Sequence, residues 1–461
     1  MQLISNAKDA YGVEDTRTIQ DCRFCGFPVR MFILFLSLIV GVLVVHTVAL
    51  RYSVLEGRYD TVDAFYYFSM FYGIFLFVLA LGVVVMSRNK RSIDVTPILR
   101  TLSTSTFLTD LATIAGVGLV FHIVAKSYVY SIADVTSFSE FREAWMYGDR
   151  SQYPLYVRLS SVAGHLLSSF IFPGIFLSSL IFQYSSKLGY SVARYLVIFM
   201  MMLVVYAFGM YSKSTILSGL LLMLLGYILS LAACFRGHYK RRRIFLPFVI
   251  ALVVTVIVFV FATEKADTQK ESVQYLQGYM DELPIKLKTD VGSKEEVIKC
   301  MSCQHIALYL NHGIWNFAQV LHDGRRGGKV LFRFIHNWIG RFGIVNTASV
   351  VRVYGRGGVT LVGAAFHDYG FLGVVALSVV MAVVLLAGIW LMTKGGFYLF
   401  AGLLIYMATG FTIAYSLLFV GPAIMSFPFI MFSSTIVFYF CLRRSAKVFG
   451  AVQYGNRQIC S

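Results

Sequence analysis

The feature that most constrains this chain is a series of long apolar segments, each with few or no charged residues. A helix needs about 20 mostly apolar residues to cross the hydrocarbon core of a bilayer, and about ten segments meet that requirement. They lie at residues 31–50, 64–86, 107–126, 158–183, 192–211, 214–235, 244–263, 370–393, 397–416 and 418–441. The sequence therefore predicts an all-α polytopic membrane protein.

The composition agrees with membrane spans and excludes an ordinary soluble enzyme. Of the 461 residues, 58% are hydrophobic and only 14% are charged, whereas about a quarter of the residues of soluble domains are charged. The first apolar segment is longer than the core of a signal peptide and has no clear small-residue cleavage site after it. We therefore expect an uncleaved first helix.

The spans divide the chain into five parts. These are an N-terminal segment (1–30), seven spans (31–263), a long loop (264–369), three further spans (370–441) and a tail (442–461). Lys and Arg concentrate in cytoplasmic loops, and with ten spans the cation-rich short connections all fall on one side. We expect that side, with both termini, to be cytoplasmic and the long loop to face outward.

The same topology accounts for the net charge of +17. About +15 of it falls on the predicted cytoplasmic face, where Lys and Arg orient the chain and attract anionic lipid headgroups. The lipid bilayer is thus an expected partner, and a nucleic-acid partner is not required.

Cations also gather in the second half of the long outer loop. At helical spacing, Arg326, Lys329, Arg333, His336 and Asn337 fall within an arc of about 100°, which predicts an amphipathic helix with a basic stripe. Such a stripe fits either an interfacial helix that touches lipid phosphates or a cleft that binds phosphate or diphosphate. The neighbouring glycine clusters at 324–329 and 355–358 do not match the GxxxxGK[ST] phosphate loop, so an ATP site is not supported.

Three motifs resemble the O-antigen polymerases of the Wzy type. Residues 360–373 read TLVGAAFHDYGFLG, and residues 209–217 read GMYSKSTIL, a cation–serine turn between two middle helices. Arg352 precedes Gly363 at an arginine-to-glycine spacing described for loops of these polymerases. In the other outer loop, 127–157, Arg142 and Arg150 have no glycine at that spacing.

The resemblance implies a GT-C-like membrane glycosyltransferase of the bacterial inner membrane. Its substrates would be undecaprenyl-diphosphate-linked oligosaccharides, and it would transfer the growing glycan to the next lipid-linked repeat unit without a metal or another cofactor. A chain-length regulator protein would be a further partner.

Such a transfer needs cations for the departing diphosphate and a base for the acceptor hydroxyl. We expect catalytic roles for Arg352, His367, Asp368 and His336; Asp368 could instead cap the following helix or pair with an arginine. Candidate diphosphate- or substrate-binding residues are Arg326, Lys329, Arg333, Arg341, Arg356, Lys213, Arg142 and Arg150. The Cys300 and Cys303 pair lacks a thioredoxin-like context, and we interpret it as structural or incidental.

Two rival functions stay open. An O-antigen ligase has a similar architecture and uses the same donor. A lipid-linked oligosaccharide flippase or transporter also has many spans, but ion-coupled transport usually places acidic residues at span centres. Here the deeper ionisable residues are His46, His122 and His165.

Overall fold

The computed structural model describes eleven helices and a two-stranded ribbon. It describes residues 27–53, 55–87, 106–132, 153–182, 192–210, 213–233, 284–288, 301–324, 330–331, 360–416 and 426–459. The helices are α3 (Phe27–Tyr52), α4 (Val62–Ser87), α6 (Phe107–Ile132), α8 (Leu155–Ser168), α9 (Ile171–Ile181), α10 (Val192–Met210), α11 (Lys213–Ala233), α15 (Met301–Asp323), α17 (Leu361–Lys394), α18 (Gly396–Tyr415) and α19 (Ser426–Ile459). The strands are β1 (Leu55–Gly57) and β2 (Ile285–Leu287).

The helices confirm a polytopic membrane protein. Within the described residues, seven helical segments are long and apolar enough to cross a bilayer, and two apolar helices, Val192–Ala207 and Phe427–Arg443, are shorter. These nine coincide with nine of the predicted spans, whereas 244–263 lies outside the described residues. The number of ten spans therefore stays a prediction.

The first helix, α3, has one buried side and one exposed side, and both sides are apolar. On α3 the side chains of Phe27, Met31 and Phe35 recur every four residues and are fully buried. Ile33 and Val40, on the other side of the same helix, are about half exposed. A span with no polar face packs one side against its neighbours and presents the other to lipid chains.

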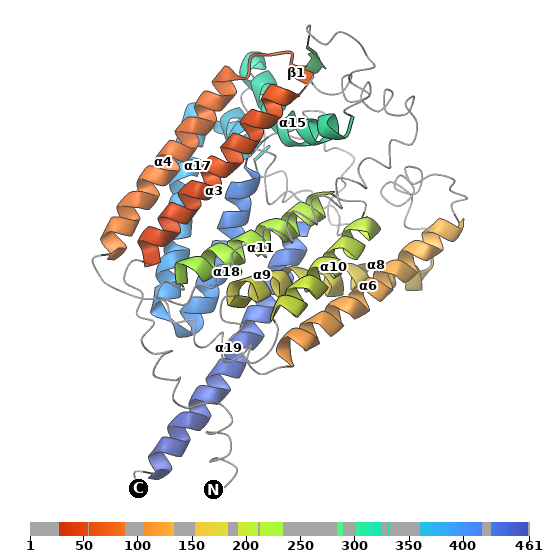
Figure 1. Cartoon of the computed structure of the whole chain (residues 1–461), viewed down its shortest axis with the longest axis vertical. Coiled ribbons are helices and arrows are strands. Elements are labelled where there is room, and N and C mark those ends of the chain that lie inside the picture. The colour runs from red at the N-terminus through yellow and green to blue at the C-terminus, as the bar shows by residue number, and fades with distance from the viewer. Residues whose placement is uncertain are drawn as a thin grey trace.

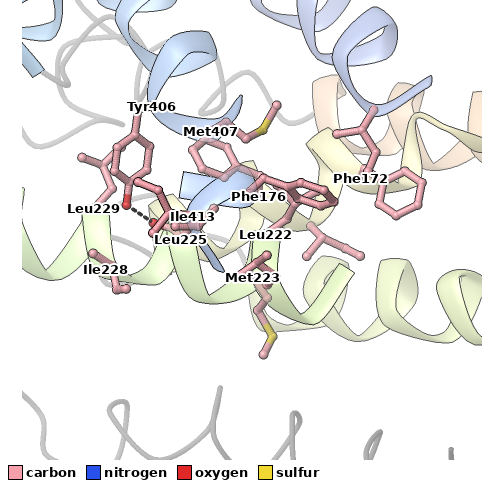
Figure 2. Close-up of a cluster of buried hydrophobic side chains, with 14 of the residues drawn as sticks. Phe172, Phe176, Leu222, Met223, Leu225, Ile228, Leu229, Tyr406, Met407 and Ile413 are labelled. Carbon is pink, nitrogen blue, oxygen red and sulfur yellow. Dashed lines mark hydrogen bonds between the residues drawn. The ribbon is translucent and has the colours of Figure 1, made fainter. Parts of the chain in front are cut away.

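Three groups of helices make up the bundle (Figure 1). On one side α3, α4 and α17 run together, and on the other α6, α8 and α10 lie side by side. Between these groups lie α9, α11 and α18, and α19 extends past the other helices to the C-terminus. The central interface is a cluster of buried hydrophobic side chains from α9, α11 and α18, in which the Tyr406 hydroxyl donates to the Leu225 carbonyl oxygen at 3.0 Å (Figure 2).

The predicted span 158–183 is two helices rather than one. α8 ends at Ser168, a turn at Ser169 and Phe170 follows, and α9 begins at Ile171. Every residue of α9 is buried. The break lies inside an apolar run without proline or glycine at the turn itself, so the sequence pattern did not predict it.

One end of the bundle, which we call the α15 end, carries β1, β2, α15 and the first turns of α4 and α17. β1 and β2 pair antiparallel with Glu56 opposite Lys286. The Lys288 ammonium donates to the Arg51 carbonyl oxygen at 3.1 Å, where a cation suits the C-terminal end of α3. β2 and α15 both come from the segment predicted as the long loop, 264–369.

Two boundaries differ from the predicted ones. α17 begins at Leu361 rather than 370, because Thr360 caps it and the chain passes through Gly370 at a kink rather than at a helix start. α19 runs without interruption to Ile459, so the segment predicted as a tail from 442 is largely helical.

Candidate active site

The start of α17 is fixed by a side-chain cap. The Thr360 hydroxyl accepts a hydrogen bond from the Gly363 N–H at 2.9 Å, and Thr360 is fully buried. Threonine at this position satisfies one of the helix's unpaired N–H groups. The Leu361 N–H, another of those groups, donates to the Ser416 carbonyl oxygen at the end of α18 at 3.1 Å. The helix start is therefore held both locally and by a neighbouring span.

Two turns further on, His367 and Asp368 form a buried pair. The His367 Nδ1 lies 3.0 Å from the Asp368 Oδ1, and the two side chains are 5% and 2% exposed. With its proton on Nδ1, the imidazole donates to the carboxylate and its Nε2 presents a lone pair. The pair thus has the arrangement in which a carboxylate orients a histidine base. The sequence prediction placed these residues in the loop before a span; they lie within α17 because its helix starts earlier.

The Asp368 carboxylate also binds a distant part of the chain. The Val330 N–H donates to Oδ1 at 3.1 Å and the Leu331 N–H donates to Oδ2 at 2.8 Å. Three donors therefore converge on one buried carboxylate, which offsets the cost of burying its charge. The alternatives for Asp368, capping α17 or pairing with an arginine, are not the contacts described.

A sharp bend follows the pair. Gly370 has φ 64° and ψ −151°, a conformation that side chains disfavour, and it separates a short helix at 361–369 from the long apolar helix that follows. A Cβ on the second glycine, Gly373, would collide with the Ala365 carbonyl oxygen. Gly370 and Gly373, two of the three glycines of the 360–373 motif, therefore each have a local reason: Gly370 makes the kink, and Gly373 lets the two helical pieces approach.

Aromatic side chains from three elements pack beside the pair. The ring of Phe366 lies 4.8 Å from that of Tyr67 on α4 and 6.0 Å from that of Phe317 on α15. Phe317 is fully buried. α15 also carries buried polar side chains, since Asn311, His312 and Asn316 are at least 94% buried. These side chains were not among the site residues predicted from the sequence.

Of the other predicted site residues, one begins a described helix. Lys213 is the first residue of α11. The remaining ones lie outside the described residues, namely Arg142, Arg150, Arg326, Lys329, Arg333, His336, Arg341, Arg352 and Arg356. The predicted amphipathic helix is not helical at Val330 and Leu331, where the backbone N–H groups turn toward Asp368.

The structure describes one of the two cysteines of the Cys300 and Cys303 pair. Cys303 lies in α15, and Cys300 lies outside the described residues. Among the side chains that the structure describes, no group of three or more His, Cys, Asp or Glu is placed to hold a metal ion.

Comparison of the chain with protein-family models, with curated proteins and with solved structures finds no match. Function therefore has to be argued from the geometry at the start of α17.

Proposed function

We propose that this protein is a membrane glycosyltransferase that polymerises lipid-linked oligosaccharide repeat units. In this proposal it transfers the growing glycan from undecaprenyl diphosphate to the next lipid-linked unit, at the outer face of a bacterial inner membrane. The α15 end faces outward, and both termini are cytoplasmic. The observation that carries the proposal is the buried His367–Asp368 pair at the α15 end, where a base would meet an acceptor sugar.

The pair supports the role of general base. The His367 Nε2 accepts the proton of the acceptor hydroxyl as that oxygen bonds to the anomeric carbon of the donor. The bond from that carbon to the diphosphate oxygen breaks, and the diphosphate leaves with the electron pair. Asp368 holds the imidazole in the required tautomer and stabilises the imidazolium that forms. Burial strengthens this interaction because little water competes for it.

The hydrogen bonds from 330–331 support a link between base and leaving group. Val330 follows Lys329 directly in the sequence, and Lys329 ends the glycine-rich basic segment 324–329. Asp368 binds Val330 and Leu331, the residues that follow that segment in the sequence, beside the base. In the proposal, cations from this segment, together with Arg352, stabilise the negative charge that develops on the departing diphosphate.

The test is a polymerisation assay with purified protein. The full chain in detergent is incubated with lipid-linked repeat units, and a ladder of longer glycans is expected. His367→Gln should lower the rate of glycan elongation by about 10²–10⁴-fold, the usual contribution of a general base. His322→Gln is the matched control, because His322 is an exposed histidine at the same end of the protein that stacks on Tyr59 at 4.3 Å; it should leave the rate unchanged.

Several results would overturn the proposal. No ladder with any repeat unit, or an undiminished ladder from His367→Gln or Arg352→Ala, would contradict it. Transfer of finished polymer to lipid A core would identify a ligase instead. Movement of labelled lipid-linked sugar across proteoliposomes without a change in its length would identify a flippase.

A further inference from the structure

A second polar cluster lies between α6, α8 and α10, away from the His367–Asp368 pair. The rings of His122 on α6 and His165 on α8 are 4.8 Å apart. The His165 Nδ1 lies 3.3 Å from the hydroxyl oxygen of Tyr206 on α10, and the ring of Tyr206 lies 5.3 Å from that of His122. His122 and Tyr206 are 1% and 2% exposed. Three hydrogen-bonding side chains from three helices thus converge inside an apolar bundle.

A lysine extends this cluster by one helical turn. Lys126 follows His122 by four residues, so the two side chains lie on the same face of α6. It is only 7% exposed, in a buried stripe of α6 that is otherwise apolar at Leu111, Ala115 and Leu119. Ionisable residues inside membrane helices are costly and usually functional.

Small residues on both helices let the backbones of α6 and α8 approach closely beside His122. A Cβ on Gly164 would lie 2.8 Å from the backbone nitrogen of His122, and Gly118 meets Ser168 in the same way one turn earlier. The two helices are therefore antiparallel, and the same register places Lys126 opposite Ser160. Close approach through small residues is the usual way in which membrane helices pack around polar groups.

The cluster lies toward the α15 end of the bundle. The ring of His165 is 6.0 Å from that of Phe429, in the first turn of α19. The start of α19 meets the end of α18, where the rings of Phe427 and Phe411 are 5.4 Å apart. The end of α18 in turn binds Leu361, at the start of α17. His165 is thus near the same end as the His367–Asp368 pair, in the other group of helices.

We propose that His122, Lys126, His165 and Tyr206 bind an anion of the phosphate class. A lysine, two imidazoles and a phenol can all donate hydrogen bonds, and such donors match phosphate oxygens, which accept several bonds at once. A polymerase holds two lipid diphosphates at the same time, one on the donor and one on the acceptor, and this site holds the second of them. That last assignment rests on the proposed function, whereas anion binding does not.

The experiment is native mass spectrometry of the full chain in detergent. Undecaprenyl diphosphate, inorganic pyrophosphate and phosphatidylcholine are titrated separately. Lys126→Gln should weaken binding of undecaprenyl diphosphate about tenfold or more, as expected for losing a hydrogen bond to a charged group. Lys394→Gln is the matched control and should stay within about twofold of the wild type, because Lys394 lies over the Trp390 ring at 4.6 Å at the other end of α17. Tyr206→Phe keeps the buried ring and should weaken binding by a smaller factor, which guards against misfolding of the lysine variant.

The outcomes separate the two sources of phosphate and the two proposals. Tight, Lys126-dependent binding of the lipid supports a headgroup site; equal Lys126-dependent binding of pyrophosphate supports a soluble anion instead. Binding that persists in a protein that gives no glycan ladder supports the anion site and counts against the polymerase. Binding by Lys126→Gln equal to that by Lys394→Gln, or Lys126-dependent binding of phosphatidylcholine as tight as that of the diphosphate, overturns the site.

Discussion

Removing the Asp368 carboxylate should release the backbone at Val330 and Leu331. In the wild type each of these N–H groups donates to one carboxylate oxygen, at 3.1 and 2.8 Å. A hydrogen bond to a charged acceptor contributes about 1.5–3 kcal/mol, and each 1.4 kcal/mol is a factor of about ten. Asp368→Ala should therefore accelerate hydrogen exchange of each amide by about 10- to 150-fold.

Amide hydrogen exchange read by mass spectrometry measures this directly, because it reports opening segment by segment. Asp368→Asn keeps a single carbonyl oxygen and should protect one of the two amides while exposing the other. Glu56→Gln is the matched control: Glu56 is an acid of the same end, paired with Lys286 at 3.2 Å on the surface, and an exposed pair of this kind contributes little. Exchange at Val330 and Leu331 in Asp368→Ala that stays within about twofold of the wild type would refute the role given to the carboxylate.

Two further predictions concern packing and a buried hydrogen bond, both measured as thermal unfolding in detergent. Gly226→Ala should destabilise the protein by about 1–3 kcal/mol, because its Cβ would lie 2.5 Å from the Phe176 carbonyl oxygen. The control Gly73→Ala, whose Cβ would have nothing within 4 Å, should be neutral or stabilising by up to about 1 kcal/mol. Equal effects of the two substitutions would contradict the packing argument. Tyr72→Phe should cost about 1 kcal/mol, since its buried hydroxyl lies 2.6 Å from the Ser416 Oγ, and a variant as stable as the wild type would show that this bond contributes nothing.

The membrane spans could be predicted because the bilayer imposes its requirement on every residue of a span. α3 and α4 have uninterrupted apolar sequences, and both begin and end within four residues of the predicted positions. The turn between α8 and α9 could not be predicted, because Ser169 and Phe170 include no proline or glycine and the turn depends on tertiary packing. Ser169 is held there by the Ser433 hydroxyl, which donates to its carbonyl oxygen at 3.0 Å from α19.

The candidate site also contains some residues that could be predicted from the sequence and others that could not. His367 and Asp368 could be singled out because ionisable residues beside an apolar span are rare. Their partners could not, since Val330 and Leu331 contribute only backbone N–H groups, which no side-chain pattern marks. The packing of Phe317 against this region likewise depends on how α15 docks on α4 and α17.

The complete burial of α9 also bears on the order in which the protein is assembled during synthesis. α9 packs against α10, α11 and α19, all of which follow it in the chain. It therefore emerges from the ribosome before most of its final neighbours exist, and Ser178 and Ser179, which are fully buried in the folded protein, are not yet covered by those later helices. The Phe438 ring of α19 lies 6.1 Å from that of Phe176. A nascent chain that stalls before α19 is made therefore leaves one side of the fully buried α9 without its protein neighbour.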